Sequence, residues 1–282
     1  MLFIERALIF ACGESQLIGV LAVPDAPFRR ALVIVVGGPQ YRAGSHRQFL
    51  LLSRQAAAAG VPVMRFDCRG MGDSGGPERS FESIDEDIAC AIDALCTHYP
   101  EVDEVVLWGL CDAASAILMY AARDVRVRGL VLLNPWVRSE ASLAKATIKH
   151  YYRSRLLDKA LWTKIVRGQF RFGQSLSSLF IDFTAVLRRN GKVKNDIANQ
   201  PFQTRMAQGL RVFSGPVLLI LSGRDITAKE FLEFTAADPH WDGLLHGKRI
   251  IRHDLLESDH TFSTRQWRDQ VATLTIDWIA SW

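Results

Sequence analysis

A cysteine lies in a short turn near the middle of the 282-residue chain, between an apolar run and a stretch with helical spacing. The turn reads GLCDAA at 109–114, and it follows the run Glu104–Trp108. This is the G-x-S-x-G pattern of a nucleophile elbow, with cysteine for serine and alanine for the last glycine. The backbone of such a turn is strained and closely packed, which explains the small residues Gly109 and Ala113. A helix N-terminus stabilises a thiolate, so Cys111 is the predicted nucleophile.

Two possible partners for this thiol follow later in the chain. Asp225 comes directly after the apolar run Val217–Ser222, at a strand end where ligand-facing groups gather in open α/β sheets. His260 lies in the segment ESDHTF at 257–262, just beyond the last expected strand. A histidine held by a carboxylate can accept the proton of a nucleophile and return it to a leaving group. The three residues therefore predict acyl-transfer chemistry.

Each of these residues also has an interpretation without catalysis. Cys111 would then be an inert buried thiol, Asp225 a helix cap and His260 a surface loop residue. Catalysis is favoured because each of the three follows an expected strand. Among the other histidines, His253 is the rival, since it ends the last expected strand, but the loop of His260 leads directly into the final helix.

The oxyanion that forms during acyl transfer needs backbone N–H donors beside the nucleophile. One expected donor is the N–H of Asp112, the residue after the nucleophile. The second is expected from the loop that follows the apolar run Ala31–Val36, which reads GGPQ at 37–40. Gly38 is the candidate in this loop, because Pro39 has no N–H to donate.

The remaining sequence supplies elements that can position these residues. Short apolar runs alternate with helical stretches of about 10–15 residues, which predicts an α/β fold with a mostly parallel eight-stranded sheet and helices on both faces. The first two strands are expected to pair antiparallel. Strands are predicted at Leu2–Phe10, Gln16–Val23, Ala31–Val36, Val61–Phe66, Glu104–Trp108, Gly129–Leu133, Val217–Ser222 and Arg249–His253. Helices are predicted at His46–Ala59, Ile84–His98, Ala113–Arg123, Lys229–Ala237 and Thr264–Ile279.

One segment interrupts the alternation. Residues 134–213 contain no convincing buried strand, so we predict a helical cap inserted between two parts of the core, 1–133 and 214–282. Between Arg138 and Arg211 there are 15 basic and 4 acidic residues, whereas the rest of the chain has 19 basic and 26 acidic ones. The cap is either a solvated lid or a docking surface for an anionic partner, such as an acyl carrier protein, a phosphorylated lipid carrier, an acidic polysaccharide or a membrane surface.

Composition excludes several other classes of protein. With 49% hydrophobic and 23% charged residues, the chain has the balance of a globular protein. Its longest apolar run is too short for a transmembrane helix, and Met1–Phe10 lacks the basic leader and uninterrupted apolar core of a secretory signal. No motif for reading nucleic acid is present. The five cysteines are scattered without a CxxC pair, which predicts a reducing cytoplasm and neither a disulfide framework nor a metal site; no cofactor is expected.

Taken together, these motifs resemble those of α/β-hydrolases over nearly the whole chain. The resemblance rests on VVGGPQ at 35–40, DCRGMGDSGG at 67–76, GLCDAA at 109–114, LLILSGRD at 218–225 and ESDHTF at 257–262. The chain order of nucleophile, acid and histidine is also the one found in this superfamily. In relatives the second segment is structural, which implies that Asp67 and Arg69 brace a loop. Dienelactone hydrolases and polyhydroxyalkanoate synthases also carry a cysteine at the elbow.

A narrower similarity concerns GGPQYRAGSHRQF at 37–49 and GLCDAASA at 109–116, which resemble the type 1 hydrolases associated with the bacterial exosortase A system. This implies a setting in exopolysaccharide biosynthesis but no particular substrate. The sequence thus predicts an ester or thioester hydrolase for a small-molecule or carrier-linked acyl substrate. An acyltransferase onto a sugar or lipid and a non-catalytic binding protein on the same fold are the alternatives.

Overall fold

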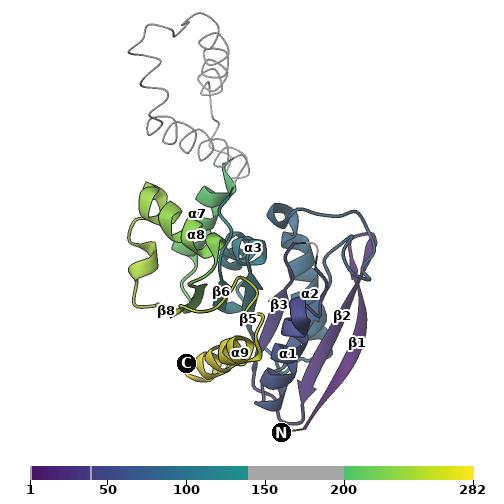
Figure 1. The fold of residues 1–282 in the computed structure, drawn as a ribbon. Helices are drawn as coiled ribbons and strands as arrows, with labels where there is room; N and C mark the ends of the chain where they lie inside the picture. Colours follow the sequence, from purple (N-terminus) through teal and green to yellow (C-terminus); the bar gives the residue numbers. More distant parts are fainter. Residues whose placement is uncertain (1, 39, 139–199) are drawn as a thin grey trace, which may run out of the picture. The chain divides into compact units, whose positions relative to one another are not determined.

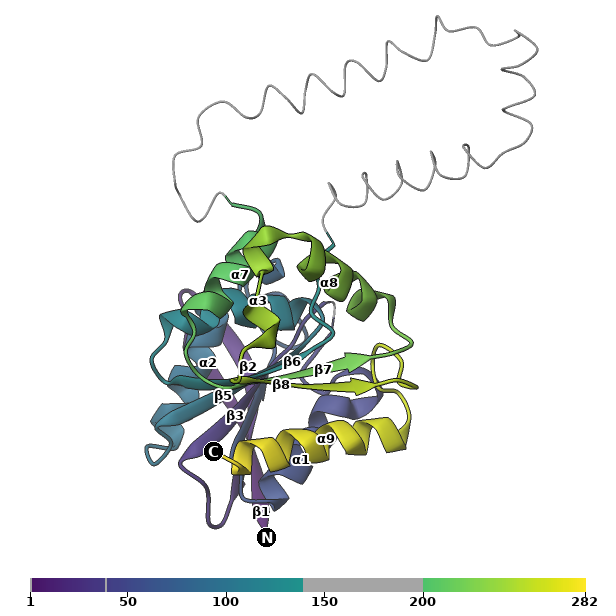
Figure 2. The same ribbon diagram turned by 90° about the vertical axis from the view of Figure 1, so that its left-hand side faces the viewer.

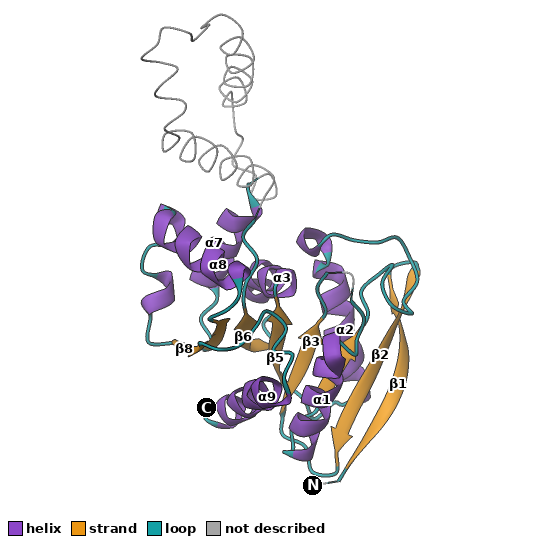
Figure 3. Cartoon of the chain, viewed as in Figure 1, coloured by secondary structure: helices purple, strands orange, loops and turns teal. Residues whose placement is uncertain are grey.

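The computed structural model describes residues 2–38, 40–138 and 200–282, and these form one eight-stranded sheet with helices packed against it (Figure 1, Figure 3). Along the sheet the order is β1-β2-β4-β3-β5-β6-β7-β8, with β2 antiparallel to both of its neighbours and the other five pairings parallel. The predicted mostly parallel sheet is therefore confirmed. The strands are β1 (Phe3–Cys12), β2 (Ser15–Pro24), β3 (Arg30–Val35), β4 (Val63–Phe66), β5 (Glu104–Leu110), β6 (Val127–Leu133), β7 (Val217–Ser222) and β8 (Ile250–Leu255).

Helices cover both faces of this sheet. Figure 2 shows α1 and α9 on one face and α2, α3, α7 and α8 on the other, and the buried apolar side chains form one cluster on each face. Strands buried on both faces need apolar residues along their whole length, which explains the continuous runs of β3, β5 and β7. The α-helices are α1 (Gln48–Ala58), α2 (Asp85–His98), α3 (Asp112–Tyr120), α7 (Phe202–Val212), α8 (Ile226–Ala237) and α9 (Arg265–Ala280). Short 3-10 turns are present at Ser45–Arg47, Phe81–Ser83, Ala121–Arg123, Pro239–Trp241 and Leu244–His246.

The eight strands and five helices predicted outside the cap each have a counterpart in the structure. The helix α7 falls within the range 134–213 that was predicted to be a cap, but it packs on α3 and belongs to the same compact unit as the sheet. Residues 139–199, which hold most of the predicted basic cap, lie outside the described residues, so the cap stays a prediction. Among the described helices, none is long and apolar enough to cross a membrane.

The sheet brings the expected site residues to one edge. Because β3, β5, β7 and β8 run parallel, their carboxyl ends lie side by side, with Val35 paired with Gly109 and Ser222 with Leu255. The loops that leave these ends carry the candidate oxyanion loop, the cysteine, the aspartate and the histidine. Ligands bind at this edge in open α/β sheets.

Candidate active site

Cys111 occupies the sharp turn between β5 and α3. Its backbone angles are φ 62° and ψ −123°, a combination that residues with a side chain rarely adopt and that costs about 1–3 kcal/mol. The turn is held by backbone hydrogen bonds, since the N–H of Cys111 donates to the carbonyl of Leu133 (2.9 Å) and its carbonyl accepts from Trp136 (3.2 Å). The half-buried thiol is thereby fixed at the carboxyl edge of the sheet.

Close packing explains the small residues around the turn. A Cβ atom added at Gly109 would lie 2.6 Å from the Cδ1 of Ile117 and 2.8 Å from the carbonyl carbon of Ala113. Ala113 is itself fully buried at the start of α3. Larger residues at these two positions would push α3 away from β5 and displace the thiol.

His260 and Asp225 form a close pair beside this thiol. The Nδ1 of His260 lies 2.7 Å from the Oδ2 of Asp225, and the aspartate is 4% exposed. Hydrogen bonds with Asp225 and, second, with Cys111 raise the pKa of His260 to about 10. The imidazole beside the sulfur therefore holds its proton more strongly than a free histidine does.

Asp225 has a second role in addition to holding the histidine. It is the N-cap of α8, and its carboxylate accepts hydrogen bonds from the N–H groups of Thr227 (3.1 Å) and Ala228 (3.3 Å). Burial by itself would raise the pKa of Asp225, but His260 and these two N–H groups outweigh burial and hold it below its ordinary value. The helix-cap interpretation considered from sequence is thus correct, and it coexists with the histidine contact.

A buried polar network that was not predicted from the sequence fixes the histidine loop. Asn134, directly after β6, donates from its side-chain nitrogen to the Ser222 hydroxyl (2.9 Å) and to the backbone carbonyl of His260 (3.2 Å). Its side-chain oxygen accepts from the backbone N–H of Ser222 (2.8 Å), and the Ser222 hydroxyl donates to the carbonyl of Asp259 (2.9 Å). The sequence signal was a lone amide residue at the end of a buried strand.

The rival histidine lies elsewhere. His253 is within β8, paired with Ile220 of β7, and the strand continues two residues further to Leu255. It therefore belongs to the sheet and not to the loop at the carboxyl edge. His260 is the histidine that the structure brings to Asp225.

The expected oxyanion residues, Gly38 and Asp112, lie together, but in an arrangement that the sequence did not indicate. The N–H of Gly38 donates to the Oδ2 of the Asp112 side chain (2.8 Å). The Oδ1 of Asp112 accepts from the N–H of Ala113 (3.0 Å). Burial raises the pKa of Asp112, whereas the surrounding backbone N–H groups oppose this change.

The DCRGMGDSGG segment braces the neighbouring loops, as the resemblance implied. Fully buried Asp67 accepts from the backbone N–H groups of Arg42 (2.6 Å) and Asp73 (3.0 Å) and forms an ion pair with the Arg42 side chain. Arg69 donates to Asp87 of α2 from its backbone (2.8 Å) and from its Nε (2.6 Å). Asp67 therefore anchors the loop that continues from Gly38.

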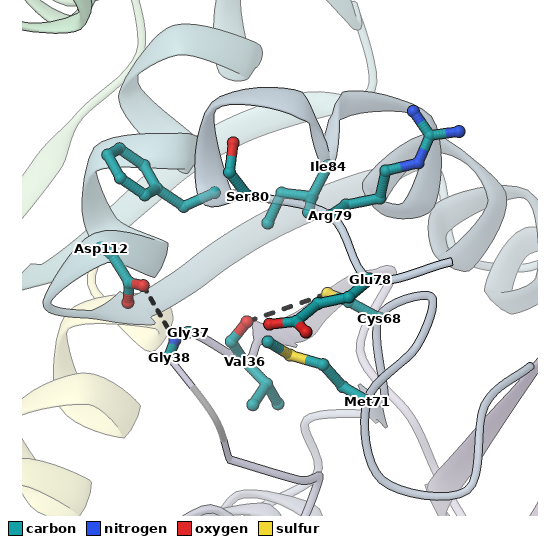
Figure 4. A pocket seen from close by; sticks show the side chains of 11 residues that line it. Val36, Gly37, Gly38, Cys68, Met71, Glu78, Arg79, Ser80, Ile84 and Asp112 are labelled. Atoms are coloured by element: carbon teal, nitrogen blue, oxygen red, sulfur yellow. Dashed lines mark hydrogen bonds between the residues drawn. The ribbon is translucent and has the colours of Figure 1, made fainter. Parts of the chain in front are cut away.

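A pocket of about 300 Å³ opens beside the oxyanion loop. Its wall at the site consists of Gly37, Gly38 and Asp112, and Figure 4 shows the Asp112 carboxylate directed at Gly38. The lining includes Asp112, the residue that follows Cys111, but not Cys111 itself. The rest of the lining is apolar at Val36, Cys68, Met71, Phe81 and Ile84 and polar at Glu78, Arg79 and Ser80.

Comparison with known proteins identifies the class. The model of the alpha/beta hydrolase family matches residues 32–274, and the chain belongs to this family. The membership confirms the predicted fold and the prediction of a hydrolase-type enzyme. No curated protein matches the sequence significantly.

Solved structures share the fold at low sequence identity. The chain is 14% identical to an esterase from Pyrococcus furiosus, with a TM-score of 0.66 over 99% of this chain and 92% of the esterase. A dienelactone hydrolase from Anabaena variabilis is also 14% identical, with a TM-score of 0.60 over 99% of this chain and 98% of the other. A serine hydrolase without a lid from Xanthomonas campestris is 12% identical, with a TM-score of 0.57 over 97% and 94%.

Proposed function

We propose that the protein hydrolyses an ester or thioester through a covalent acyl-cysteine intermediate. Cys111 is the nucleophile, His260 moves the proton, and Asp225 holds the histidine. The N–H groups of Gly38 and Asp112 are the oxyanion donors. The observation that carries this proposal is the position of His260, which hydrogen-bonds Asp225 through Nδ1 at 2.7 Å and also contacts the cysteine.

The reaction begins when the Cys111 sulfur attacks the substrate carbonyl carbon. A carbon–sulfur bond forms, and the carbonyl electron pair moves onto oxygen, where the backbone N–H donors stabilise it. When the carbonyl re-forms, the bond to the leaving alcohol or thiol breaks, and this group takes a proton from His260. Water then attacks the acyl-cysteine while His260 accepts one of its protons. As the carbonyl re-forms, the carbon–sulfur bond breaks, the acid leaves, and His260 returns the proton to the Cys111 sulfur.

The pocket beside the oxyanion loop supports a small acyl substrate. Its volume of about 300 Å³ is at the lower end of the range for small-molecule sites. The apolar side chains of its lining suit a short hydrocarbon chain, and the polar side chains suit a hydrogen-bonding head group.

Two finer parts of the proposal rest on the sequence alone. The similarity to the exosortase-associated hydrolases favours a cytoplasmic role in exopolysaccharide biosynthesis. The basic charge between Arg138 and Arg211 favours an acyl group presented on an anionic carrier. Transfer to a sugar or lipid hydroxyl uses the same intermediate, and added acceptors would reveal it as an acylated product formed in place of free acid.

The direct test is site-resolved alkylation of the five cysteines by iodoacetamide below neutral pH. Burial raises the pKa of Cys12, Cys68 and Cys96, so these thiols stay protonated and serve as internal references. We expect Cys111 to react selectively and His260→Ala to slow this reaction. In the same variant, turnover of short acyl thioesters should fall by about 10²–10⁴.

Unselective alkylation of the cysteines would instead support a non-catalytic binding protein on a hydrolase fold. In that case all accessible cysteines would react alike at low pH, and His260→Ala would leave the reactivity of Cys111 unchanged. His253→Ala is the matched control, because this histidine lies in β8, away from the loop that carries His260. It should behave like the wild-type protein in both assays.

A further inference from the structure

Two backbone N–H groups donate to the side chain of Asp112. Gly38 donates to Oδ2 at 2.8 Å and Ala113 donates to Oδ1 at 3.0 Å. The N–H of Gly38 is also one of the donors that the proposed function assigns to the oxyanion. A negatively charged group of the protein therefore already occupies the place where the negative charge of the reaction would form.

The neighbouring sequence makes room for this arrangement. A Cβ atom at Gly37 would lie 2.0 Å from the Oδ1 of Asp112 and 2.7 Å from the nitrogen of Ala113. Gly38 has φ +59°, a conformation that favours glycine. The two glycines thus allow the loop to approach the carboxylate closely enough for the 2.8 Å hydrogen bond.

The carboxylate and a substrate oxyanion cannot share the same donors. Both are anions, and each would need the Gly38 N–H at hydrogen-bond distance. Burial also disfavours the charged form of Asp112 by raising its pKa, so the N–H contacts offset a desolvation cost that departure of the side chain would remove. The side chain can turn toward the adjoining pocket, which it already lines (Figure 4).

We infer that the Asp112 side chain is the resting occupant of the oxyanion hole and that a substrate carbonyl must displace it before Cys111 can react. This inference rests on the proposed function. Displacement adds the same cost for every substrate, so only those that gain enough binding energy in the pocket offset it. Asp112 is thereby a specificity-determining residue that selects against very small, weakly bound esters.

The anion site can be tested without catalysis by titrating acetate into protein labelled with ¹⁵N. In Asp112→Ala the vacated donors should bind acetate, with saturable shifts of the Gly38 and residue-112 amide signals. In wild type and in Asp112→Asn, whose side chain keeps an acceptor in place, these signals should not respond. Glu78→Ala is the matched control, because it removes another carboxylate of the pocket and leaves Asp112 in place.

A second readout compares iodoacetate with iodoacetamide, which carry the same electrophile but differ in charge. The rate of iodoacetate divided by the rate of iodoacetamide at Cys111 should be at least about tenfold higher in Asp112→Ala than in Asp112→Asn. The vacated N–H donors would favour the anionic reagent, and one hydrogen bond to a charged group has an effect of this size. If Asp112→Ala does not fold, Asp112→Ser replaces it, because its hydroxyl is one bond shorter than the carboxylate oxygens.

The possible outcomes separate this inference from the proposed function. Equal acetate responses in Asp112→Ala and wild type, or equal rate ratios in the Ala and Asn variants, would overturn the inference even if Cys111 is reactive. A Cys111 that reacts with neither reagent, together with saturable acetate binding at Gly38 in Asp112→Ala, would overturn the cysteine mechanism and leave the occupied anion site supported.

Discussion

The Nδ1 of His260 lies 2.7 Å from the Oδ2 of Asp225, and the same carboxylate caps α8 by accepting from the N–H groups of Thr227 and Ala228. One side chain thus starts a helix and orients an imidazole. Both tasks use the two carboxylate oxygens of Asp225, but only the pairing with His260 needs their negative charge. Asparagine removes the charge and keeps a capping oxygen, whereas alanine removes both, so the two tasks can be tested separately.

Asp225→Asn should greatly reduce activity while it preserves the cap of α8. Asparagine is as good an N-cap as aspartate, but it cannot stabilise a protonated His260, so we expect turnover to fall by about 10²–10⁴. Asp225→Ala should lose a further ~1 kcal/mol of unfolding free energy with the cap. Enzyme assays and urea unfolding measure both effects. Asp238→Asn, at the cap of the Pro239–Trp241 turn, is the control, and a fully active Asp225→Asn would contradict the assigned role.

The pairing of His260 should also make stability depend on pH. Because the pKa of His260 is about 10 in the folded protein, above the usual value of about 6.5, its stabilising contribution is complete below about pH 6.5 and disappears as the pH rises through about 10. The difference in unfolding free energy between wild type and His260→Gln should therefore shrink steadily over this window. A difference that stayed constant with pH would show that His260 is not preferentially protonated in the folded state.

Asn134 is expected to position the histidine loop. Asn134→Gly accommodates the φ of 42° at this position but removes the hydrogen bonds to Ser222 and to the His260 carbonyl. Unfolding free energy should fall by about 1–3 kcal/mol. Because this anchor holds the loop that carries His260, kcat should fall while KM changes little. Wild-type kcat in a destabilised variant would limit Asn134 to a structural role.

Gly109 should tolerate no side chain. An added Cβ would approach the backbone of Ala113 and Ala114 within 2.9 Å, so Gly109→Ala should lower the unfolding free energy by about 1–3 kcal/mol and reduce the reactivity of Cys111. Gly247→Ala is the matched control, since nothing lies within 4 Å of its added Cβ and its φ of −69° is ordinary. Equal stability of the two variants would contradict the close packing of the elbow.

The sheet could be predicted from sequence because each of its central strands has a local pattern. Continuous apolar runs such as Ala31–Val36 and Val217–Ser222, in a chain with alternating helical segments, are typical of parallel strands covered on both faces. The elbow was recognisable from the spacing around Cys111, and parallel strands bring their carboxyl ends to one edge. Asp225 and His260 lie close together because they follow the carboxyl ends of the adjacent parallel strands β7 and β8.

Other features depend on contacts that no local pattern encodes. Asn134 meets Ser222 and His260 across 88 and 126 residues of chain, and nothing near position 134 indicates these partners. The orientation of the Asp112 side chain follows from the close approach of Gly37 and Gly38, which only the folded loop defines. From sequence, Asp112 was expected to contribute its N–H and not its carboxylate.

The central claim is that Cys111 forms a covalent acyl intermediate. The most direct measurement is intact-protein mass spectrometry after brief exposure to a short acyl thioester, followed by peptide mapping. We expect the mass of one acyl group on Cys111, formed during turnover and lost when substrate is exhausted, and no adduct in Cys111→Ala. Substrate turnover without an adduct, combined with full activity in Cys111→Ala, would contradict the mechanism.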